Sequence, residues 1–409
     1  MQRLLEAFRP GEMIYLPGAT GEIVALGAAL GADPGRLAGS HIVSCLVPGI
    51  NRTDLAALDE RAQLTTFLLP PELRPSFIAG RVRVLPLGYR AIARWLGEQA
   101  RLDTAIAHVA PPGADGRCSF GIASDFSPIA WRRADRRIAF INHAMPTMRR
   151  GPSIDPGEAD LMVEGESELI EVAPPVPSAT TAAIARNAAA LIPDGAAIQL
   201  GIGSAPAALC TALGDHRGLR LRSGMAPEGL LALADVGALA APSQHVAGIA
   251  AGSRALYHRL AEHDLVAFAD TGATHDHATL AALDRFHAVN SALEVDLFGQ
   301  ANLEWREGQL VSGVGGALDF AHAAIASHGG RSLTLMPSIS RGTSRIVPRL
   351  GCATVSIGRC DLDTLVTEHG IAELRTRSLD DRAAAIIGIA DPDHRDALAR
   401  AWRQLKASF

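Results

Sequence analysis

Short apolar runs recur along the chain and are separated by stretches of helix-like length. In the first half these runs occupy residues 41–47, 82–87, 104–110 and 137–143. Alternation of strand-like and helix-like segments is typical of α/β proteins, in which helices connect neighbouring parallel strands. The first half is therefore predicted to hold a largely parallel sheet flanked by helices.

The same alternation returns after an interruption by prolines. Residues 171–180 hold three prolines within four positions, and 181–192 follow as an alanine-rich helix with Ser178 or Thr180 as its N-cap. Strands are then expected in 196–203, 217–224, 265–270, 331–338, 352–358 and 364–370. We expect two α/β domains, residues 1–175 and 176–409, with a ligand cleft between them.

Composition narrows the range of partners. A net charge of −5 and a pI near 6.3 give no reason to expect nucleic acid or an anionic membrane as a partner. The five scattered cysteines predict reduced thiols, and Met1–Pro10 carries charges where a signal peptide would be apolar. A cytoplasmic protein that acts on a small molecule is the expectation.

Lysine is almost absent, which excludes several chemistries. Lys406 is the single lysine among 38 basic residues. Schiff-base formation, pyridoxal phosphate attachment and a Walker-type phosphate loop all need a lysine inside the fold. A bound phosphate would have to be held by arginine, backbone N–H groups or helix N-termini.

Three loops in the second half carry candidate binding chemistry. Gly201 and Gly203 lie between a strand and a helix, where glycines serve either a tight turn or an anion at the helix N-terminus. Residues 311–316 hold three glycines, which can present successive N–H groups as an anion nest or oxyanion hole. Residues 335–351 combine serines and threonine with Arg341 and Arg345, a set that suits phosphate contacts. Together the loops favour a large anionic ligand.

Histidine does not indicate a metal. His275 and His277 form the only close histidine pair in a chain of fourteen histidines, and no third ligand stands at metal spacing. We predict that both are solvated loop residues and that the protein holds no metal.

Segments spread along the chain resemble the acetyl-CoA hydrolase/transferase family. The resemblance is carried by residues 109–126, 193–206, 290–304, 312–324, 344–348, 366–387 and 389–398. It implies a CoA-transferase-like pair of α/β domains that bind a CoA thioester between them, with homodimerisation as a family habit. In that family a glutamate attacks the thioester and becomes acylated, and CoA is then passed to a carboxylate.

The resemblance also implies roles for individual residues. It implies CoA contacts from Gly201, Ile202, Gly203, Ser204, Ala205, Ser312, Gly313, Gly315, Gly316 and Arg341, the last in place of a lysine. Gly316 would also donate an N–H to the oxyanion. The position of the family's glutamate is held by Gly224, so the usual acyl-enzyme should not form here.

Three interpretations follow from a glycine at this position. Water or an acceptor can attack the thioester directly, with Glu228 or Glu294 as general base, giving a hydrolase or a direct CoA-transferase. The protein can instead bind acyl-CoA without chemistry, as a regulator or the inactive partner of a competent paralogue. In the third interpretation another glutamate has moved into the site.

Overall fold

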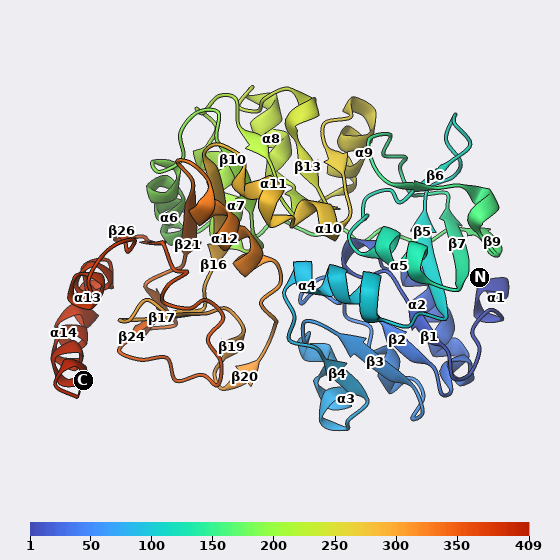
Figure 1. Ribbon diagram of the computed structural model, residues 1–409, viewed down its shortest axis with the longest axis horizontal. Coiled ribbons are helices and arrows are strands. Elements are labelled where there is room, and N and C mark those ends of the chain that lie inside the picture. The colour runs from blue at the N-terminus through green and yellow to red at the C-terminus, as the bar shows by residue number, and fades with distance from the viewer. Residues whose placement is uncertain (409) are drawn as a thin grey trace.

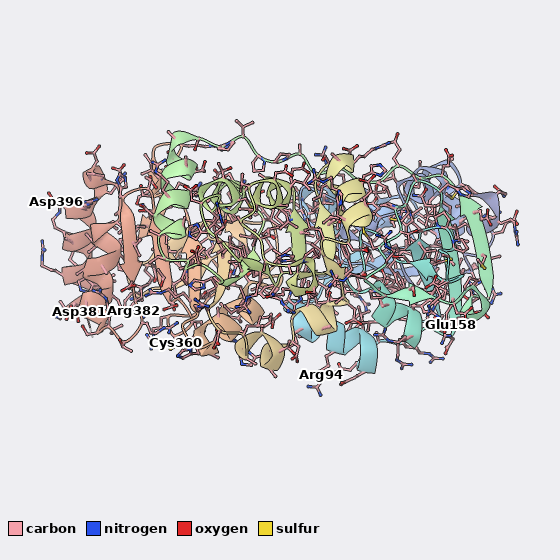
Figure 2. The ribbon with its side chains drawn as sticks, turned by 90° about the horizontal axis from the view of Figure 1, so that it is seen from above. Arg94, Glu158, Cys360, Asp381, Arg382 and Asp396 are labelled. Atoms are coloured by element: carbon pink, nitrogen blue, oxygen red, sulfur yellow. The ribbon has the colours of Figure 1, made fainter. Side chains whose placement is uncertain are left out.

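The computed structural model describes residues 1–408 as two α/β halves that lie side by side along the long axis. Figure 1 places the N-terminus at one end of that axis and the C-terminal helices α13 and α14 at the other. Each half is built around its own sheet, and the view from above in Figure 2 shows the same elongated arrangement. The predicted α/β class with largely parallel sheets is confirmed.

The first sheet has seven parallel strands in the order β4-β3-β2-β1-β5-β7-β9. Its strands are β1 Met13–Tyr15, β2 His41–Val43, β3 Gln63–Thr66, β4 Val82–Val84, β5 Thr104–Val109, β7 Arg136–Asn142 and β9 Leu161–Gly165. The strand order runs outward in both directions from β1 and β5, so the chain reverses direction across the sheet between these two strands. Ligands of open α/β sheets bind at such a reversal, beyond the carboxyl ends of the strands.

The second sheet has six strands in the order β11-β10-β16-β21-β25-β26, and only the last pairing is antiparallel. Its strands are β10 Ala197–Leu200, β11 Arg220–Leu221, β16 Phe286–Ser291, β21 Arg331–Leu335, β25 Thr364–Thr367 and β26 Gly370–Glu373. Short pairings outside the two sheets join β6 Cys118–Ser119 with β8 Ser153–Ile154, β12 Met225–Pro227 with β14 Ile249–Ala251, β13 Val246–Ala247 with β15 Ala267–Phe268, β17 Glu294–Asp296 with β18 Ala301–Asn302 and β24 Ile346–Val347, β19 Trp305–Arg306 with β20 Gln309–Leu310, and β22 Ile339–Ser340 with β23 Thr343–Ser344.

Helices cover both sheets and connect their strands. They are α1 Gln2–Leu5, α2 Val24–Ala32, α3 Arg74–Ile78, α4 Tyr89–Arg94, α5 Ser127–Arg133, α6 Ala179–Ala189, α7 Ser204–Ala212, α8 Gly229–Asp235, α9 Arg254–His263, α10 Thr271–Thr274, α11 His277–Ala281, α12 Ala317–Ala326, α13 Leu379–Gly388 and α14 Pro392–Lys406. None of the helices within residues 1–408 is long and apolar enough to cross a membrane.

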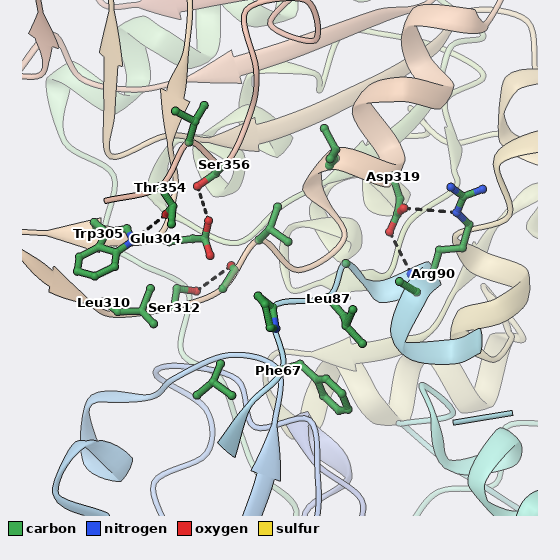
Figure 3. A pocket seen from close by; sticks show the side chains of 18 of the residues that line it. Phe67, Leu87, Arg90, Glu304, Trp305, Leu310, Ser312, Asp319, Thr354 and Ser356 are labelled. Carbon is green, nitrogen blue, oxygen red and sulfur yellow. Dashed lines mark hydrogen bonds and ion pairs between the residues drawn. The ribbon is translucent and has the colours of Figure 1, made fainter. Parts of the chain in front are cut away.

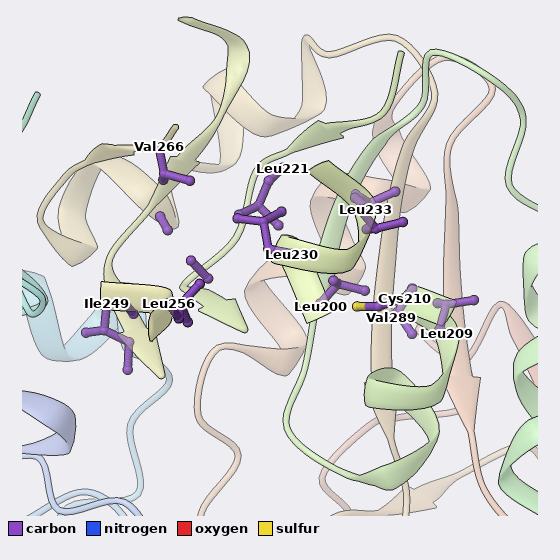
Figure 4. Close-up of a cluster of buried hydrophobic side chains, with 14 of the residues drawn as sticks. Leu200, Leu209, Cys210, Leu221, Leu230, Leu233, Ile249, Leu256, Val266 and Val289 are labelled. Atoms are coloured by element: carbon purple, nitrogen blue, oxygen red, sulfur yellow. The ribbon is translucent and has the colours of Figure 1, made fainter. Parts of the chain in front are cut away.

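The core of the second half fixes the ends of its strands. Figure 4 shows Leu200 of β10 and Val289 of β16 packed beside Leu209 and Cys210 of α7, with Leu230 of α8 nearby. These side chains are buried, and each fully buried leucine stabilises the fold by about 2 kcal/mol. The packing therefore holds the carboxyl ends of the central strands in place, where the candidate site lies.

Residues 352–358, predicted as a strand, form no strand. Ser356 and Ile357 are buried, and Ile357 makes an isolated bridge to Ala301. Val355 is exposed, so the apolar run lies on the surface instead of in a sheet. The other segments predicted as strands each contain one, although β15 pairs outside the second sheet.

The predicted domain boundary falls in a connecting segment. Residues 166–178 contain neither helix nor strand and run from β9 to α6. The division at residue 175 stays a prediction, because the two halves also contact each other extensively around the cavities described below.

Helix α6 begins with a capping box. The Ser178 side chain accepts a hydrogen bond from Thr181 N at 3.1 Å, and the Thr181 hydroxyl accepts one from Ser178 N at 2.8 Å. We expect Ser178→Ala to lower the stability by about 1 kcal/mol, measured as a lower midpoint of thermal unfolding, while Ser178→Thr keeps the cap and the midpoint. An unchanged midpoint in Ser178→Ala would contradict the assignment of this cap.

Candidate active site

Three cavities lie side by side between the two halves. The smallest, which we call the central cavity, has a volume of about 180 Å³ and lies beyond the carboxyl ends of strands from both sheets. Its walls come from Ala19, Val47, Leu68, Tyr89 and Asp125 in the first half, and from residues 199–202, 224–225, Ile249, His275, Asn290, 312–317 and Phe320 in the second. Both halves are therefore needed to complete this cavity.

The two larger cavities share walls with the central cavity. The α4 groove, of about 710 Å³, is lined by residues 84–94 in part, Trp305, Leu310, 312–314 and 354–356 (Figure 3). The linker pocket, of about 310 Å³, is lined by residues 48–50, 172–175, 200–207 in part and 225–229 in part. The α4 groove and the linker pocket therefore adjoin the central cavity on two sides.

The loop 312–316 separates the central cavity from the α4 groove. A side chain at Gly313 would place its Cβ 2.6 Å from the carbonyl oxygen of Phe67, so the loop passes directly against the end of a strand of the first half. Gly315 has φ +58°, a conformation that favours glycine, and Gly316 is the N-cap of α12. Gly316 and Ala317, where α12 begins, both line the central cavity, and the N–H of Ala317 donates to the carbonyl of Val314.

The second predicted loop forms the opposite wall. Gly201 lies against the carbonyl of Val289, which is 2.9 Å from the place of a Cβ, and Gly203 has φ +130° as the N-cap of α7. Ile202 is 60% exposed and lines both the central cavity and the linker pocket. Gly201 and Ile202 thus line the central cavity together with residues 312–316, whereas Gly203 and Ser204 line the linker pocket.

Gly224 lines the central cavity, and a histidine side chain occupies the adjacent space. A Cβ at Gly224 would lie 3.1 Å from Cε1 of His275, and a Cβ at Gly316 would lie 2.3 Å from its Nε2. The imidazole is therefore wedged between the two glycines. Its ring centroid also lies 4.4 Å from that of Phe320 and 5.3 Å from that of Tyr89.

The prediction that His275 is a solvated loop residue is wrong. Its side chain is only 2% exposed, because the short helix α10 turns it inward between the two halves. Burial lowers the pKa of His275 to about 3, so the ring is neutral at physiological pH. Its Nδ1 is 2.9 Å from the Thr274 hydroxyl, which leaves the Nε2 edge toward the glycines. His277, also predicted to be a solvated loop residue, is half-exposed and is the first residue of helix α11.

Asp125 contributes a buried carboxyl group to the same cavity. It is 9% exposed, its Oδ1 accepts a 2.7 Å hydrogen bond from the Thr271 hydroxyl, and Thr271 N donates to its carbonyl oxygen. Burial raises its pKa to about 6, although the Thr271 hydrogen bond acts in the opposite direction. Sequence reasoning missed this residue, although it lies within the 109–126 segment that carries the family resemblance.

An unpaired amide group also lines the cavity. Asn290 is 7% exposed, and its Oδ1 accepts a 3.4 Å hydrogen bond from Gln199. Its Nδ2 has no hydrogen-bond partner among residues 1–408. A buried amide nitrogen without a partner is costly, and such groups often face a ligand.

The predicted general bases lie elsewhere. Glu228 accepts hydrogen bonds from N and Oγ of Ser253, at 2.7 and 3.0 Å, and so holds the start of α9. Glu294 lies in β17, half-buried, where burial raises its pKa and Arg345 lowers it. The structure brings neither glutamate to the wall of the central cavity.

Arg341 lies at the tip of the β22–β23 hairpin. It has φ +51°, its side chain is exposed, and Nη1 is 3.6 Å from Oε1 of Glu307. It is outside the three cavities. Among the described residues, no group of three or more His, Cys, Asp or Glu side chains is placed to hold a metal ion.

Comparisons with known proteins agree on one family. The sequence profile described as the acetyl-CoA hydrolase/transferase C-terminal domain matches residues 252–402. The chain is 30% identical to a 4-hydroxybutyrate coenzyme A transferase of Clostridium kluyveri, over 94% of this chain and 92% of that one. It is 31% identical to a butyryl-CoA:acetate CoA-transferase of Anaerostipes caccae, over 74% and 73% of the two chains.

Solved structures give the same result. RipA from Yersinia pestis superposes with a TM-score of 0.92 at 28% identity, covering 99% of this chain and 96% of that one. A 4-hydroxybutyrate CoA-transferase from Porphyromonas gingivalis superposes with a TM-score of 0.82 at 26% identity, covering 100% and 96%.

The raised pKa of Asp125 makes a prediction for stability. Its folded pKa, about 6, exceeds the unfolded value near 3.9, so its contribution favours folding at low pH and is lost as the pH rises through that interval. We expect Asp125→Asn to be more stable than the native protein by roughly 2–3 kcal/mol at pH 8, with no difference below about pH 4. Unfolding curves across this pH range test it, and parallel pH dependences of the two proteins would refute it.

Proposed function

The chain belongs to the acetyl-CoA hydrolase/transferase family, and from this premise we propose that it binds an acyl-CoA thioester in the central cavity and cleaves it without a glutamyl intermediate. Direct attack by water, giving a free acid and CoA thiol, is the reaction that the site supports best. Direct transfer of CoA to a carboxylate is the variant in which the acceptor replaces water.

Gly224 is the observation that carries this proposal. Glycine has no side chain, so no acyl-enzyme forms at this position, and the imidazole of His275 limits what else fits there. The nucleophile that attacks the thioester carbonyl must therefore be water or an acceptor carboxylate that enters the cavity with the substrate. Covalent catalysis splits a reaction into two steps, whereas here the binding loops have to stabilise a single direct attack.

The two glycine loops supply groups suited to that task. The N-terminus of α12 lies beside Gly316 at the cavity wall, where a helix N-terminus would stabilise negative charge on a thioester oxygen. The α7 N-terminus beside Gly203 lines the linker pocket. We assign CoA contacts to the 201–205 and 312–316 loops. Arg341, exposed on its hairpin, would reach a phosphate of CoA only outside the cavities.

A second function keeps the binding without the chemistry. The glycine loops suffice to hold acyl-CoA, and loss of the nucleophile alone would leave a regulator or an inactive partner of a competent paralogue. A rise in melting temperature with CoA and no turnover would favour this function. Turnover of any acyl-CoA would favour the first.

Release of free CoA thiol from a panel of short acyl-CoAs, with and without acetate, tests the proposed function. We expect thiol release without acetate. Release that requires acetate points to direct transfer, and CoA-dependent stabilisation without release under any condition rejects catalysis in favour of binding.

Restoring the glutamate should require room beside His275. In Gly224→Glu the new Cβ lies 3.1 Å from the imidazole, so we expect little covalent chemistry from this variant. In Gly224→Glu/His275→Ala the space is open, and we expect acyl-CoA to leave a CoA adduct on the protein, visible as an increase in intact mass. His275→Ala alone is the control. An equal adduct yield in single and double variants would show that His275 does not occupy the glutamate's space.

A further inference from the structure

The central cavity contains one carboxyl group that the family resemblance did not assign to the reaction. Asp125 lies on the first half, between β6 and α5, and reaches the cavity that Gly224 and the loop 312–316 line from the second half. Oδ1 is held by Thr271, while no hydrogen bond among residues 1–408 reaches Oδ2. One oxygen is thus fixed and the other is free to accept a proton.

We propose that Asp125 is the general base that activates water for direct attack on the thioester. This inference rests on the proposed hydrolysis and names the group that makes it possible. Glu228 and Glu294, the bases suggested by the sequence, are engaged or lie outside the cavity wall, which leaves Asp125 as the carboxylate facing the reacting space.

The reaction balances with water as the only co-reactant. Water oxygen bonds to the thioester carbonyl carbon while Oδ2 of Asp125 accepts a water proton. The tetrahedral intermediate then breaks its C–S bond, and the departing CoA sulfur takes the proton back from Asp125. The products are the carboxylic acid and CoA thiol, and the carboxylate is regenerated.

The cavity also offers hydrogen-bond donors for this reaction. Nδ2 of Asn290 has no partner among the described residues and lines the same cavity, and the N-terminus of α12 lies beside Gly316. A carboxylate oxygen without a donor and an amide nitrogen without an acceptor thus border one space of about 180 Å³. A water molecule and a thioester carbonyl supply what each of them lacks.

The groups around Asp125 do not change charge in the pH range in which Asp125 titrates. Burial raises the pKa of Tyr15, Cys45 and Tyr89 well above their ordinary values, so these neighbours stay neutral. His275 is neutral as well, since its pKa is about 3. Farther out, Asp270 of the same α10 region is paired with Arg132 at 2.9 Å. Between pH 5 and 8 Asp125 is therefore the member of this cluster that changes charge.

The test is the pH profile of kcat/KM for CoA release from a short acyl-CoA, measured on the full-length protein. We expect activity to fall as the pH drops through about 6, where the carboxylate becomes protonated. Asp125→Asn should lower kcat by about 10²–10⁴-fold with a much smaller change in KM. The residual activity of this variant should no longer fall as the pH drops through about 6, the fall that we call the acidic limb of the profile. Asp103→Asn is the matched control. Asp103 accepts a hydrogen bond from Met13 N and lies away from the three cavities.

Thr271→Val provides a second, milder test. The Thr271 hydrogen bond lowers the pKa of Asp125, so its loss should move the acidic limb to higher pH without abolishing activity. If Asp125 had only a structural role, the acidic limb of the pH profile would not move in Thr271→Val. This variant tests the assignment with the Asp125 carboxyl group still in place.

The outcomes separate this assignment from the proposed function. An active native protein with an equally active Asp125→Asn, or with a limb that Thr271→Val does not move, overturns the role of Asp125 and leaves hydrolysis standing. A native protein whose melting temperature rises with CoA but which releases no thiol at any pH overturns both.

Discussion

Close contact between backbone and backbone across the two halves is the constraint on which this site depends. The loop 312–316 passes so near the end of β3 that only a glycine fits at position 313, where a Cβ would meet the Phe67 carbonyl at 2.6 Å. Interiors are packed at crystal-like density, so a side chain at position 313 would force the loop and the end of β3 apart. The same loop leads directly into the N-terminus of α12, which adjoins His275 at Gly316.

Periodicity was enough to predict the fold class, because buried parallel strands read as apolar runs that few other structures produce. It failed at residues 352–358, where Val355 is apolar but exposed, since a pattern of residue types does not tell which side of the chain meets solvent. The 201–205 and 312–316 loops could be found because glycines at strand-to-helix turns leave a recognisable trace. Asp125 and His275 could not, because their roles arise from burial between segments distant in sequence.

The lowered pKa of His275 and the raised pKa of Asp125 have the same physical cause. Both lie where water is excluded, which disfavours the charged form of each group and so moves their pKa values in opposite directions. Such placement weakens the fold and is retained at sites where a reaction uses it.

Helix α10 has a consequence for motion. Thr271 belongs to the second half yet donates to both Oδ1 and the main-chain oxygen of Asp125 in the first, and Arg132 ties the same helix from across the boundary. Any hinge that separates the halves must break these bonds and admit water to the carboxyl group, which returns it to the acidity of a free aspartate. The basicity of Asp125 therefore depends on contact between the two halves, because burial at that contact is the cause of its raised pKa.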